Sequence, residues 1–502
     1  MKFIVLGGGL TGLSCALTLK KNGHEVVVLE KDAEVGGWTR CFRMDGYTFD
    51  LGPHFLFGRP VLQALCELVG NSLELKTLRS HAERGNELHA LEKMYFRGRY
   101  FNYPFKPKDF LINLEHSWIP GIFFDLAVRG IKASSSDLFL RGNQNNDSIV
   151  CVEDWVINSV GKRVYTYTHL GDYISKLYGL SPRLVSKDWG VQKLKFLRNM
   201  NPFKLGIKTI VGSNNEKGII SYPPSGIDTI SNHLSKSFLE FGGKTIVGAK
   251  ALAVSSEGDR GIGVDYISEG KKSSVTGDFL ISTIPVDELT RMLTPAPADA
   301  VFEAVTALRY RVLIALFLCV NKEQVTPYGC VYFSEKRFPF KRITEFTNLS
   351  EKMAPKGKTS LCIEITCFKD DEILQKDDKS IYDLVLTSLE QEGFLKRTEV
   401  EKYKVVRIPN AYPVYDLSYY KNLETVFNYL STFNRIVSIG RQGLFSYNTM
   451  GNSIRGGLSI GKELSATDPS RWNSIVQAKY KGRLEKYYHA LHSAELRLED
   501  VH

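Results

Sequence analysis

The sequence lacks the paired cysteines that many metal and thiol redox sites use. Its eight cysteines include no Cys-x-x-Cys pair, although closely spaced cysteines are typical of zinc sites and disulfide oxidoreductases. Cys362 and Cys367 lie in an apolar, strand-like run, and Cys15 lies in an expected helix. We therefore expect no metal site, and we expect reduced, mostly buried thiols in a cytoplasmic protein.

Long apolar runs and blocks of like charge are missing as well. The apolar run that comes nearest to a membrane span, VLIALFLCV (Val312 to Val320), has the length of a strand, whereas a spanning helix needs about 20 residues. Lys and Arg total 65 against 55 Asp and Glu, without a cluster typical of a nucleic-acid-binding tail. We expect no transmembrane segment and no nucleic-acid partner. The formal charge of +10 leaves open a solvated basic surface, an anionic ligand or a peripheral membrane contact.

The first thirty residues contain a strand, a glycine turn, a helix and a second strand. KFIVL predicts a buried strand, Leu13 to Asn22 a helix, and Glu25 to Leu29 a strand parallel to the first. In the G-x-G-x-x-G turn between them, the glycines permit the tight turn, the approach of a diphosphate to the backbone, and close helix–strand packing. Glu30 follows 18 residues after Gly12 and can accept hydrogen bonds from a ribose. This pattern predicts a dinucleotide site formed by Gly7, Gly9, Leu10, Thr11, Gly12, Glu30 and Lys31.

A second glycine motif follows in the stretch LEKDAEVGGWTR. Its Gly-Gly-Trp-Thr-Arg sequence (residues 36–40) resembles the second glycine motif of the amine oxidase, protoporphyrinogen oxidase and phytoene desaturase superfamily of FAD enzymes. The resemblance implies FAD as the cofactor, with Gly37 and Trp38 along its pyrophosphate and ribityl chain and Arg40 as a phosphate contact. A guanidinium group suits a diphosphate because it can donate two parallel hydrogen bonds.

Further segments resemble UDP-galactopyranose mutase-like proteins of this superfamily, in the same order along the chain. The resemblance covers roughly residues 1–460. The segments that carry it are GYTFDLGPHFLFG (46–58), FRGRYFNYPFKPKDF (96–110), YISKLYGLSP (173–182), SYPPSGIDTI (221–230), LRYR (308–311) and IGRQGLFSYNTMGNSI (439–454).

These matches imply roles for individual residues. The resemblance implies flavin contacts at Gly52, His54, Gly440, Arg441 and Met450. It implies substrate contacts at Tyr173, Tyr178, Lys193, Tyr222, Arg311 and Tyr447, and catalytic roles for His54, Arg311 and Tyr447. From its residue type alone, His54 is equally well interpreted as a core histidine, and each tyrosine as a packed core residue with a bonded hydroxyl.

The sequence also departs from the mutase pattern. Mutases usually carry acidic residues in Y-x-D-M-D, whereas this chain has Tyr-Asn-Thr-Met-Gly at residues 447–451. Phe57 occupies a position where bacterial mutases often have histidine, and Lys193 stands where arginine is usual. Lysine cannot reproduce the two-pronged grip of a guanidinium group. We infer a mutase-like relative whose substrate is left open.

Strand patterns of one nucleotide-binding domain occur at the start, middle and end of the chain. Lys244 to Val254, Asp278 to Thr283 and Arg435 to Ile439 each predict a strand. We therefore predict an α/β fold, in which a discontinuous Rossmann-like FAD-binding domain carries an inserted mixed α+β substrate domain. We assign residues 1–75, 215–285 and 430–465 to the FAD-binding domain, residues 76–214 and 286–429 to the substrate-binding insertions, and residues 466–502 to a charged helical tail on the outside.

The sequence leaves three functions open. The first is an FAD-dependent enzyme of the superfamily that carries out flavin-mediated oxidoreductase chemistry on a small molecule. The alternative is a UDP-galactopyranose mutase-like isomerase that uses reduced FAD as a nucleophile on a nucleotide-diphosphate sugar. A noncatalytic accessory flavoprotein is the third. The oligomeric state is not predicted.

Overall fold

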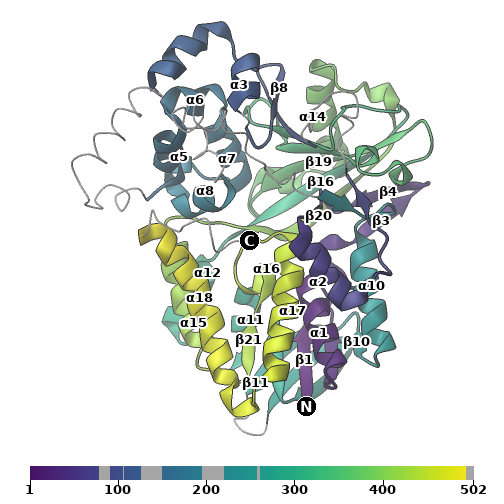
Figure 1. Ribbon diagram of the computed structural model, residues 1–502, viewed down its shortest axis with the longest axis vertical. Coiled ribbons are helices and arrows are strands. Elements are labelled where there is room, and N and C mark those ends of the chain that lie inside the picture. Colours follow the sequence, from purple (N-terminus) through teal and green to yellow (C-terminus); the bar gives the residue numbers. More distant parts are fainter. Residues whose placement is uncertain (79–90, 106, 126–149, 195–219, 257–260, 493–502) are drawn as a thin grey trace.

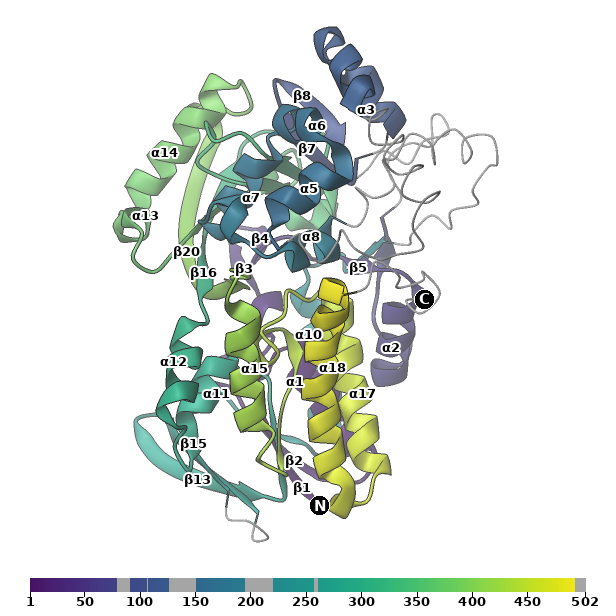
Figure 2. The ribbon, with the colours of Figure 1, turned by 90° about the vertical axis from the view of Figure 1, so that its left-hand side faces the viewer.

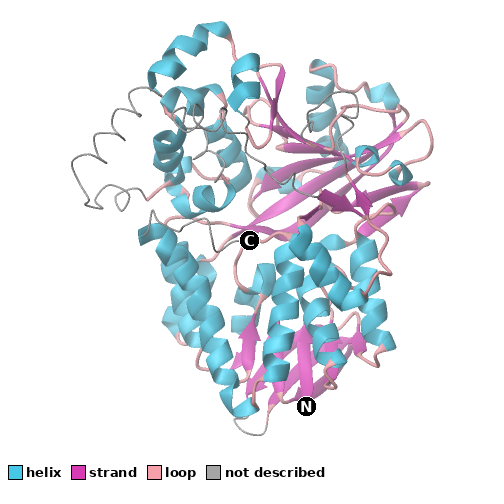
Figure 3. Cartoon of the chain, in the orientation of Figure 1, coloured by secondary structure: helices cyan, strands magenta, loops and turns pink. Residues whose placement is uncertain are grey.

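The computed structural model describes residues 1–78, 91–105, 107–125, 150–194, 220–256 and 261–492 (Figure 1). The other residues of the predicted domains, including part of the Phe96–Phe110 motif and the end of the tail, lie outside the described residues. The molecule has two halves along its long axis (Figure 3). Helices cover a parallel sheet in the lower half, and a large mixed sheet and a group of helices form the upper half.

The lower half is organised around a five-stranded parallel sheet. Its strands come from the beginning, the middle and the end of the described chain, and they are buried because helices and a second sheet cover the parallel sheet. The predicted parallel pairing of the first two strands is confirmed, with Phe3 opposite Val26. The strand order is β10 (Lys244–Ile246), β2 (Glu25–Leu29), β1 (Lys2–Leu6), β14 (Phe279–Ser282) and β21 (Ile436–Ser438).

One predicted strand is divided in two. The sequence favoured a single strand from Lys244 to Val254, but the chain leaves the parallel sheet after Ile246 and turns at Gly248, where φ is +63°. It then enters a separate four-stranded sheet, because a left-handed turn at glycine redirects the backbone. That sheet consists of β13 (Lys271–Gly277), β12 (Ile262–Ser268), β11 (Lys250–Ser256) and β15 (Leu293–Thr294).

Helices and the four-stranded sheet pack around the parallel sheet (Figure 2). Helix α1 (Leu10–Lys21) packs against α17 (Met450–Ala466), where a Cβ on Gly457 would overlap the carbonyl oxygen of Thr11. The small residues therefore allow these two helices to cross closely. The other helices of the lower half are α2 (Arg59–Val69), α10 (Asp228–Glu240), α11 (Val286–Met292), α12 (Asp299–Ala307), α15 (Tyr419–Leu430), α16 (Gly440–Gly443) and α18 (Trp472–His492).

The predicted helical tail packs on the lower half with one face buried and the other exposed. Helix α18 lies beside α17 and α15, and Trp472, Val476 and Tyr480 are almost completely buried. The Trp472 ring packs against Phe3 and Phe279 of the parallel sheet, at centroid distances of 5.4 and 4.9 Å. Trp472, Val476 and Tyr480, spaced one turn apart, give the segment a buried face despite its overall charge.

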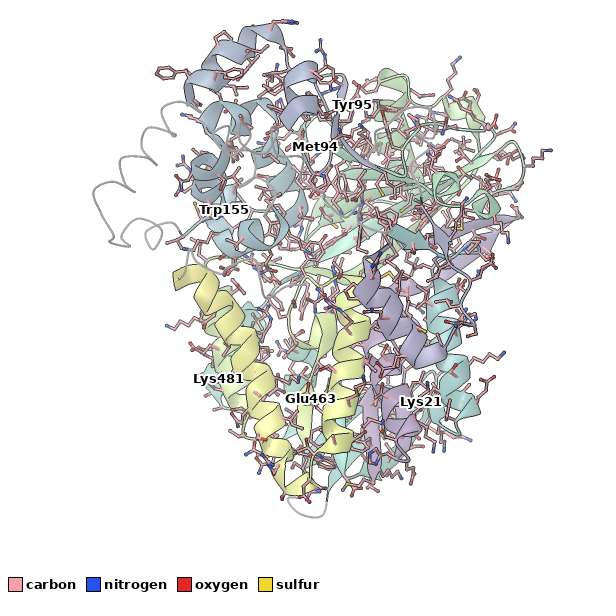
Figure 4. The ribbon with its side chains drawn as sticks, viewed as in Figure 1. Lys21, Met94, Tyr95, Trp155, Glu463 and Lys481 are labelled. Atoms are coloured by element: carbon pink, nitrogen blue, oxygen red, sulfur yellow. The ribbon has the colours of Figure 1, made fainter. Side chains whose placement is uncertain are left out.

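The upper half contains a seven-stranded mixed sheet. Its longest apolar strand, β16, contains eleven residues, all of them buried. Figure 4 shows Met94 and Tyr95 on the sheet and Trp155 in the neighbouring helical group, whereas Glu463 and Lys481 lie on helices of the lower half. The strand order is β20 (Val400–Pro413), β16 (Tyr310–Val320), β19 (Thr359–Cys367), β18 (Arg342–Glu345), β17 (Cys330–Phe333), β7 (Glu92–Phe96) and β8 (Arg99–Asn102).

The helical group of the upper half is tied to this sheet. Lys176 donates from Nζ to the carbonyl oxygens of Phe333, Glu335 and Phe340 at 2.5, 2.9 and 3.1 Å. These bonds fix α7 over the connection between β17 and β18. The group contains α3 (Pro107–Asn113), α5 (Val152–Val160), α6 (Lys162–Tyr167), α7 (Leu170–Tyr178) and α8 (Lys187–Lys193), and α13 (Glu372–Gln375) and α14 (Asp378–Gln391) flank the sheet elsewhere.

Small sheets connect the two halves. Strands β3 (Cys41–Met44) and β4 (Tyr47–Asp50) form a hairpin, and a three-stranded sheet has the order β5 (Leu56–Phe57), β9 (Ile220–Tyr222) and β6 (Lys76–Thr77). The chain therefore passes between the halves several times, and the residues between them are held from both sides.

Candidate functional site

The glycine turn after β1 has the geometry of a dinucleotide-binding turn. Gly7 has a φ of +97°, and a Cβ on Gly12 would overlap the carbonyl oxygen of Gly7. At Gly9, by contrast, no atom lies within 4 Å of an added Cβ. Helix α1 begins directly after Gly9 without a side-chain cap or an acidic residue in its first turn. Its first N–H groups, which are the positive end of the helix dipole, are therefore available to an anion.

Glu30 lies at the carboxyl end of β2 with its carboxylate fixed. One carboxylate oxygen accepts a hydrogen bond from the Gly8 N–H at 2.7 Å, and the other accepts one from the Asp32 N–H at 2.9 Å. Each oxygen keeps a second acceptor position, so the carboxylate can still receive ribose hydroxyl groups. Lys31 is exposed beside it.

The second glycine motif lies against the first. The Gly36 N–H donates to the Gly8 carbonyl oxygen at 2.8 Å, and a Cβ on Gly37 would lie 3.5 Å from the Gly9 Cα. Arg40 donates from Nε to the Gly37 carbonyl oxygen at 3.1 Å and pairs with Asp32 at 2.9 Å. Trp38 is partly buried in this loop. The two motifs thus form one surface, with Arg40 at its edge.

The closing segment near the C-terminus reaches the same place. Gly440 has a φ of +84°, and its Cβ would lie 2.9 Å from Thr11 Oγ1. Arg441 follows, with its terminal nitrogens donating to the carbonyl oxygens of Asn448 and Ala411 at 2.9 and 2.8 Å, while its buried Nε has no hydrogen-bond partner among the described residues. Met450 begins α17. Segments 430 residues apart therefore meet at one point.

These features fit FAD. The open space at Gly9 and the uncapped start of α1 suit the pyrophosphate, Glu30 suits the adenosine ribose, and the unpartnered Nε of Arg441 has a free donor. When FAD binds, these groups would hold it, and FAD would supply hydride-transfer chemistry or, in its reduced state, a nucleophilic nitrogen.

Tyrosines and cations gather beside the closing segment. Lys193 Nζ lies 3.8 Å from the centroid of the Tyr447 ring and donates to the Tyr447 carbonyl oxygen at 2.8 Å. The Arg441 guanidinium lies 4.6 Å from the same ring, and the Tyr412 ring stands perpendicular to it at 5.2 Å. Burial raises the pKa of the Tyr447 hydroxyl, which therefore stays protonated and can donate a hydrogen bond.

A buried group of charges lies on the mixed sheet at this site. Lys341 donates from Nζ to Glu364 at 2.6 Å and to the Tyr412 hydroxyl at 3.0 Å, and Arg342 donates from Nε to Glu364 at 3.1 Å. Burial on its own would raise the pKa of Glu364, but Arg342 and Lys341 outweigh it and lower that pKa to about 2. Glu364 is completely buried, and it is ionised at neutral pH.

A wall of aromatic rings continues from these charges. The Tyr332 ring lies 4.6 Å from that of Tyr103 and 6.2 Å from that of Tyr173, and Arg342 lies 5.5 Å above it. Burial raises the pKa of Tyr173 strongly, and nearby Tyr103 and Tyr447 raise it further. Tyr173 and Tyr447, both predicted as substrate contacts, therefore lie in the same neighbourhood.

His54 lies where the two halves meet. A Cβ on Gly52, two residues before it, would lie 3.4 Å from Glu364 Oε1. Burial lowers the pKa of His54 to about 4, with further influence from Arg342 and Arg441. Its Nδ1 has no hydrogen-bond partner among the described residues. The imidazole is therefore neutral at physiological pH.

The other predicted substrate residues have different surroundings. Tyr178 is buried against Trp189, at a centroid distance of 5.6 Å, and its pKa is raised by burial, with Tyr447 among the further influences. Arg311 donates to the Thr366 carbonyl oxygen at 2.8 Å, and its guanidinium lies 4.1 Å from the Phe368 ring. Tyr222 donates to Asp50 at 2.7 Å. Tyr222 is thus engaged by Asp50, whereas Arg311 keeps Nε and Nη1 without a hydrogen-bond partner among the described residues.

Sequence reasoning missed part of the site. The cluster of Lys341, Arg342 and Glu364 had one sequence signal, the single carboxylate inside the apolar run TSLCIEITCF. A buried charge needs a partner, so this residue pointed to cations on a neighbouring strand. Among the described residues there is no group of three His, Cys, Asp or Glu side chains that could hold a metal, and no helix has the length and apolar character to cross a membrane.

Comparisons with solved structures agree with this architecture. A reduced UDP-galactopyranose mutase is 19% identical with a TM-score of 0.73, covering 94% of this chain and 98% of that one. A protein from Exiguobacterium sp. 255-15 described as a protoporphyrinogen oxidase is 15% identical with a TM-score of 0.68, covering 92% and 98%. A putrescine oxidase bound to putrescine is 14% identical with a TM-score of 0.62, covering 93% and 100%. At such identities these likenesses show the fold.

Similar curated sequences match over short segments. A protein of the nifH2 3′ region of Methanothermococcus thermolithotrophicus is 57% identical over 54 residues, which are 11% of this chain and 52% of the relative. A 4,4′-diapophytoene desaturase of Staphylococcus haemolyticus is 40% identical over 74 residues, 15% of each chain. The chain thus spans about half or less of the length of these relatives.

The family model for flavin-containing amine oxidoreductases matches residues 10–424. This range begins at Leu10, within the first glycine motif, and includes the second glycine motif and both strands of the buried charge group. The chain belongs to the flavin-containing amine oxidoreductase family and is a flavoenzyme with an α/β, Rossmann-like FAD-binding domain and a substrate domain.

Proposed function

We propose that this flavoenzyme acts on an anionic small molecule, a nucleotide-diphosphate sugar. The observation that carries the proposal is the charge balance of the site. Among the described residues named above, Lys341 and Arg342 pair with the one ionised carboxylate, that of Glu364, and two further cations, Lys193 and Arg441, lie against the Tyr447 ring. Buried charges without partners are costly, so an excess of cations favours an anionic ligand.

Part of this excess belongs to the cofactor. We assign Arg441 to the FAD pyrophosphate, as the family resemblance implies, and Lys341 to Glu364, to which it donates at 2.6 Å. We propose that Lys193 and Arg342 contribute to binding a second diphosphate, and each is also bonded within the protein, Lys193 to the Tyr447 carbonyl oxygen and Arg342 to Glu364. Both side chains can donate charge-assisted hydrogen bonds to such a group.

The same balance argues against the substrates named for other family members. A diamine such as putrescine is cationic and would be repelled by these side chains. A polyene such as diapophytoene could not compensate the cost of burying them. A diphosphate both neutralises the cations and leaves the aromatic rings of Tyr173, Tyr332 and Tyr447 to pack against a sugar or a base.

The side chains have the following proposed roles. The neutral imidazole of His54 accepts or donates a proton, and the protonated hydroxyls of Tyr447 and Tyr412 donate hydrogen bonds to the ligand. Burial of these groups excludes water from the reacting atoms. The substrate roles of Arg311 and Tyr222 stay predictions. The eight unpaired cysteines support the proposal of a cytoplasmic location.

A charge reversal tests the substrate class. We expect UDP and UDP-sugars to perturb the flavin absorbance of the purified protein, and Lys193→Glu to weaken that binding on the order of a hundredfold by adding repulsion to the loss of a charged bond. Lys236→Glu, at a side chain that is 76% exposed, is the control. Equal UDP affinity of Lys193→Glu and the control, or tighter binding of putrescine than of UDP, contradicts the proposal.

The reaction type is decided by the electron balance. A screen of UDP- and dTDP-sugars, analysed by chromatography, is run with oxidised enzyme and with dithionite-reduced enzyme under anaerobic conditions. Isomerised product from reduced enzyme alone, without consumption of reductant, identifies a mutase. Bleaching of the flavin by one substrate identifies net oxidation. Absence of both, with FAD bound, identifies an accessory protein and refutes catalysis.

A further inference from the structure

Helix α18 lies beyond the residues matched by the family model, yet it reaches the candidate site. The match ends at residue 424, whereas α18 spans Trp472–His492. In Figures 1 and 2 it runs beside α17 and α15 toward the junction of the two halves. Trp472 anchors its first turn under the parallel sheet, as described above. The helix therefore starts from a fixed position and extends toward Tyr447.

Arg483 of α18 bonds to the backbone just before Tyr447. It donates from Nε to the Leu444 carbonyl oxygen at 2.8 Å and from Nη2 to the Phe445 carbonyl oxygen at 2.7 Å. Only 6% of Arg483 is exposed. One guanidinium thus holds two successive carbonyl groups by charge-assisted hydrogen bonds, which are stronger than neutral ones.

The held backbone is a strained turn. Phe445 has a φ of +45°, a left-handed conformation that a bulky residue rarely adopts and that persists only where the surroundings enforce it. Directly after it, the Ser446 N–H donates to the Arg441 carbonyl oxygen at 2.8 Å, and the Tyr447 N–H donates to the Tyr415 hydroxyl at 2.9 Å. The turn therefore sets where Tyr447 lies.

A second residue of α18 holds the other end of the same segment. Tyr480, three positions before Arg483, accepts a hydrogen bond from the Ser438 N–H at 2.9 Å. Ser438 ends β21, the edge strand of the parallel sheet, so its N–H has no partner strand beyond it. The Tyr480 ring is stacked on Phe427 at 4.9 Å, which fixes the hydroxyl.

We propose that α18 is a clamp on residues 438–447, and that Arg483 is the positioning residue that sets Tyr447 for the ligand. Arg483 acts on Tyr447 through the carbonyl groups of Leu444 and Phe445. The hold on the backbone stands independently of the substrate, and its effect on ligand affinity rests on the proposed function.

Hydrogen–deuterium exchange tests the hold on the backbone without reference to any substrate. We expect Arg483→Ala to speed exchange in peptides covering residues 438–450 by on the order of tenfold or more, because a charged bond to each carbonyl is lost. Arg483→Lys, which keeps the charge but not the two-pronged geometry, is expected to lie between Arg483→Ala and the unaltered protein. The matched control is Lys479→Ala. Lys479 lies on the same helix as Arg483, and its removal breaks a 2.7 Å bond to Glu463 of α17.

A UDP titration of the same variants tests the consequence for the ligand. Arg483→Ala is expected to weaken UDP binding by on the order of tenfold, with Lys479→Ala unchanged. If the unaltered protein binds no UDP, the proposed function fails while the exchange data still decide the clamp. Unchanged exchange over 438–450 in Arg483→Ala overturns the clamp. If Arg483→Ala does not fold, Tyr480→Phe takes its place, and unchanged exchange of the Ser438 amide in that variant overturns the clamp.

Discussion

At the scale of single residues, Glu364 affects both the charge available to a ligand and the stability of the fold. Its carboxylate is completely buried and bonded to Lys341 and Arg342, so removing the negative charge leaves two cations without compensation. Breaking one partner of a buried pair typically costs about 3–5 kcal/mol. The same residue determines how many positive charges remain for a ligand, so its loss would change both folding and binding.

The pKa of Glu364 predicts a defined acid dependence. The native pKa is about 2, below the ordinary value of 4.5, so the unfolded chain takes up a proton first as the pH falls. The stability that Glu364 contributes is therefore fully present above pH 4.5 and is lost progressively between 4.5 and 2. We expect Glu364→Gln to lower the thermal midpoint at pH 7, with a gap to the unaltered protein that narrows as the pH falls below 4.5.

Thermal unfolding followed at a series of pH values measures this gap. Glu25→Gln, which alters an exposed pair with Lys2 at 3.5 Å, should show little effect at any pH because surface pairs contribute little. A gap between Glu364→Gln and the unaltered protein that stays constant from pH 7 to 3 would show that the native pKa of Glu364 is not lowered below that of the unfolded chain.

Local backbone structure could be predicted from the sequence where the spacing of a few residues determines the geometry. The glycines at positions 7, 9 and 12 and Glu30 predicted a turn and a strand end that the structure has, because the pattern is contained in thirty residues. The cluster around Glu364 depends on the register of β18 and β19, in which Arg342 lies opposite Glu364. Such a register is set by packing of the whole sheet, and sequence spacing does not contain it.

At the scale of elements, two glycines at the start of α1 have different roles, one in cofactor binding and one in packing. Gly9 has ordinary φ and no neighbour within 4 Å of an added Cβ, whereas Gly12 packs against Gly7. One glycine therefore keeps room for a ligand, and the other allows the protein to pack. The difference gives a sharp test, because only the ligand would be displaced by a methyl group at Gly9.

We expect Gly9→Ala to fold with the thermal midpoint of the unaltered apoprotein. Its affinity for FAD should fall on the order of tenfold or more, because the methyl group occupies the pyrophosphate position. Gly12→Ala should lower both the midpoint and the flavin content. The ratio of flavin to protein absorbance and the apoprotein midpoint give the two readings. Gly482→Ala, which also has no neighbour within 4 Å, is the control. Full flavin content in Gly9→Ala would place the cofactor elsewhere.

The prediction of strands from apolar patterns was wrong where one apolar run contributes strands to two sheets. Residues 244–254 are apolar enough for a single strand, but Gly248 divides them between β10 and β11. In α18 the segment as a whole is charged, and its buried face is formed by Trp472, Val476 and Tyr480. In both cases tertiary contacts determine the outcome.

At the scale of the whole molecule, the cofactor surface combines segments that are distant in sequence. The turn at Gly9, the loop at Gly37 and the closing residues at Gly440 meet at one place between the halves. A ligand bound there favours the state in which all three are assembled, and its stabilisation grows with its free concentration.

We therefore expect reconstitution of the apoprotein with FAD to raise the unfolding midpoint of both halves together. At a free FAD concentration of about 100 times Kd, the stabilisation should be about 2.7 kcal/mol. Circular dichroism and release of flavin fluorescence should report the same midpoint. Two separate transitions, with only one shifted by FAD, would show that the halves unfold independently.

The position of β21 has a consequence for synthesis on the ribosome. The strand spans Ile436–Ser438 and pairs with β14, which ends at Ser282. While the intervening residues are translated, the nascent chain keeps β14 with an open edge, which is a template for unwanted pairing. Because α18 must also emerge before it can cover Phe279, complete assembly of the flavin site follows the synthesis of α18, long after that of the first glycine turn.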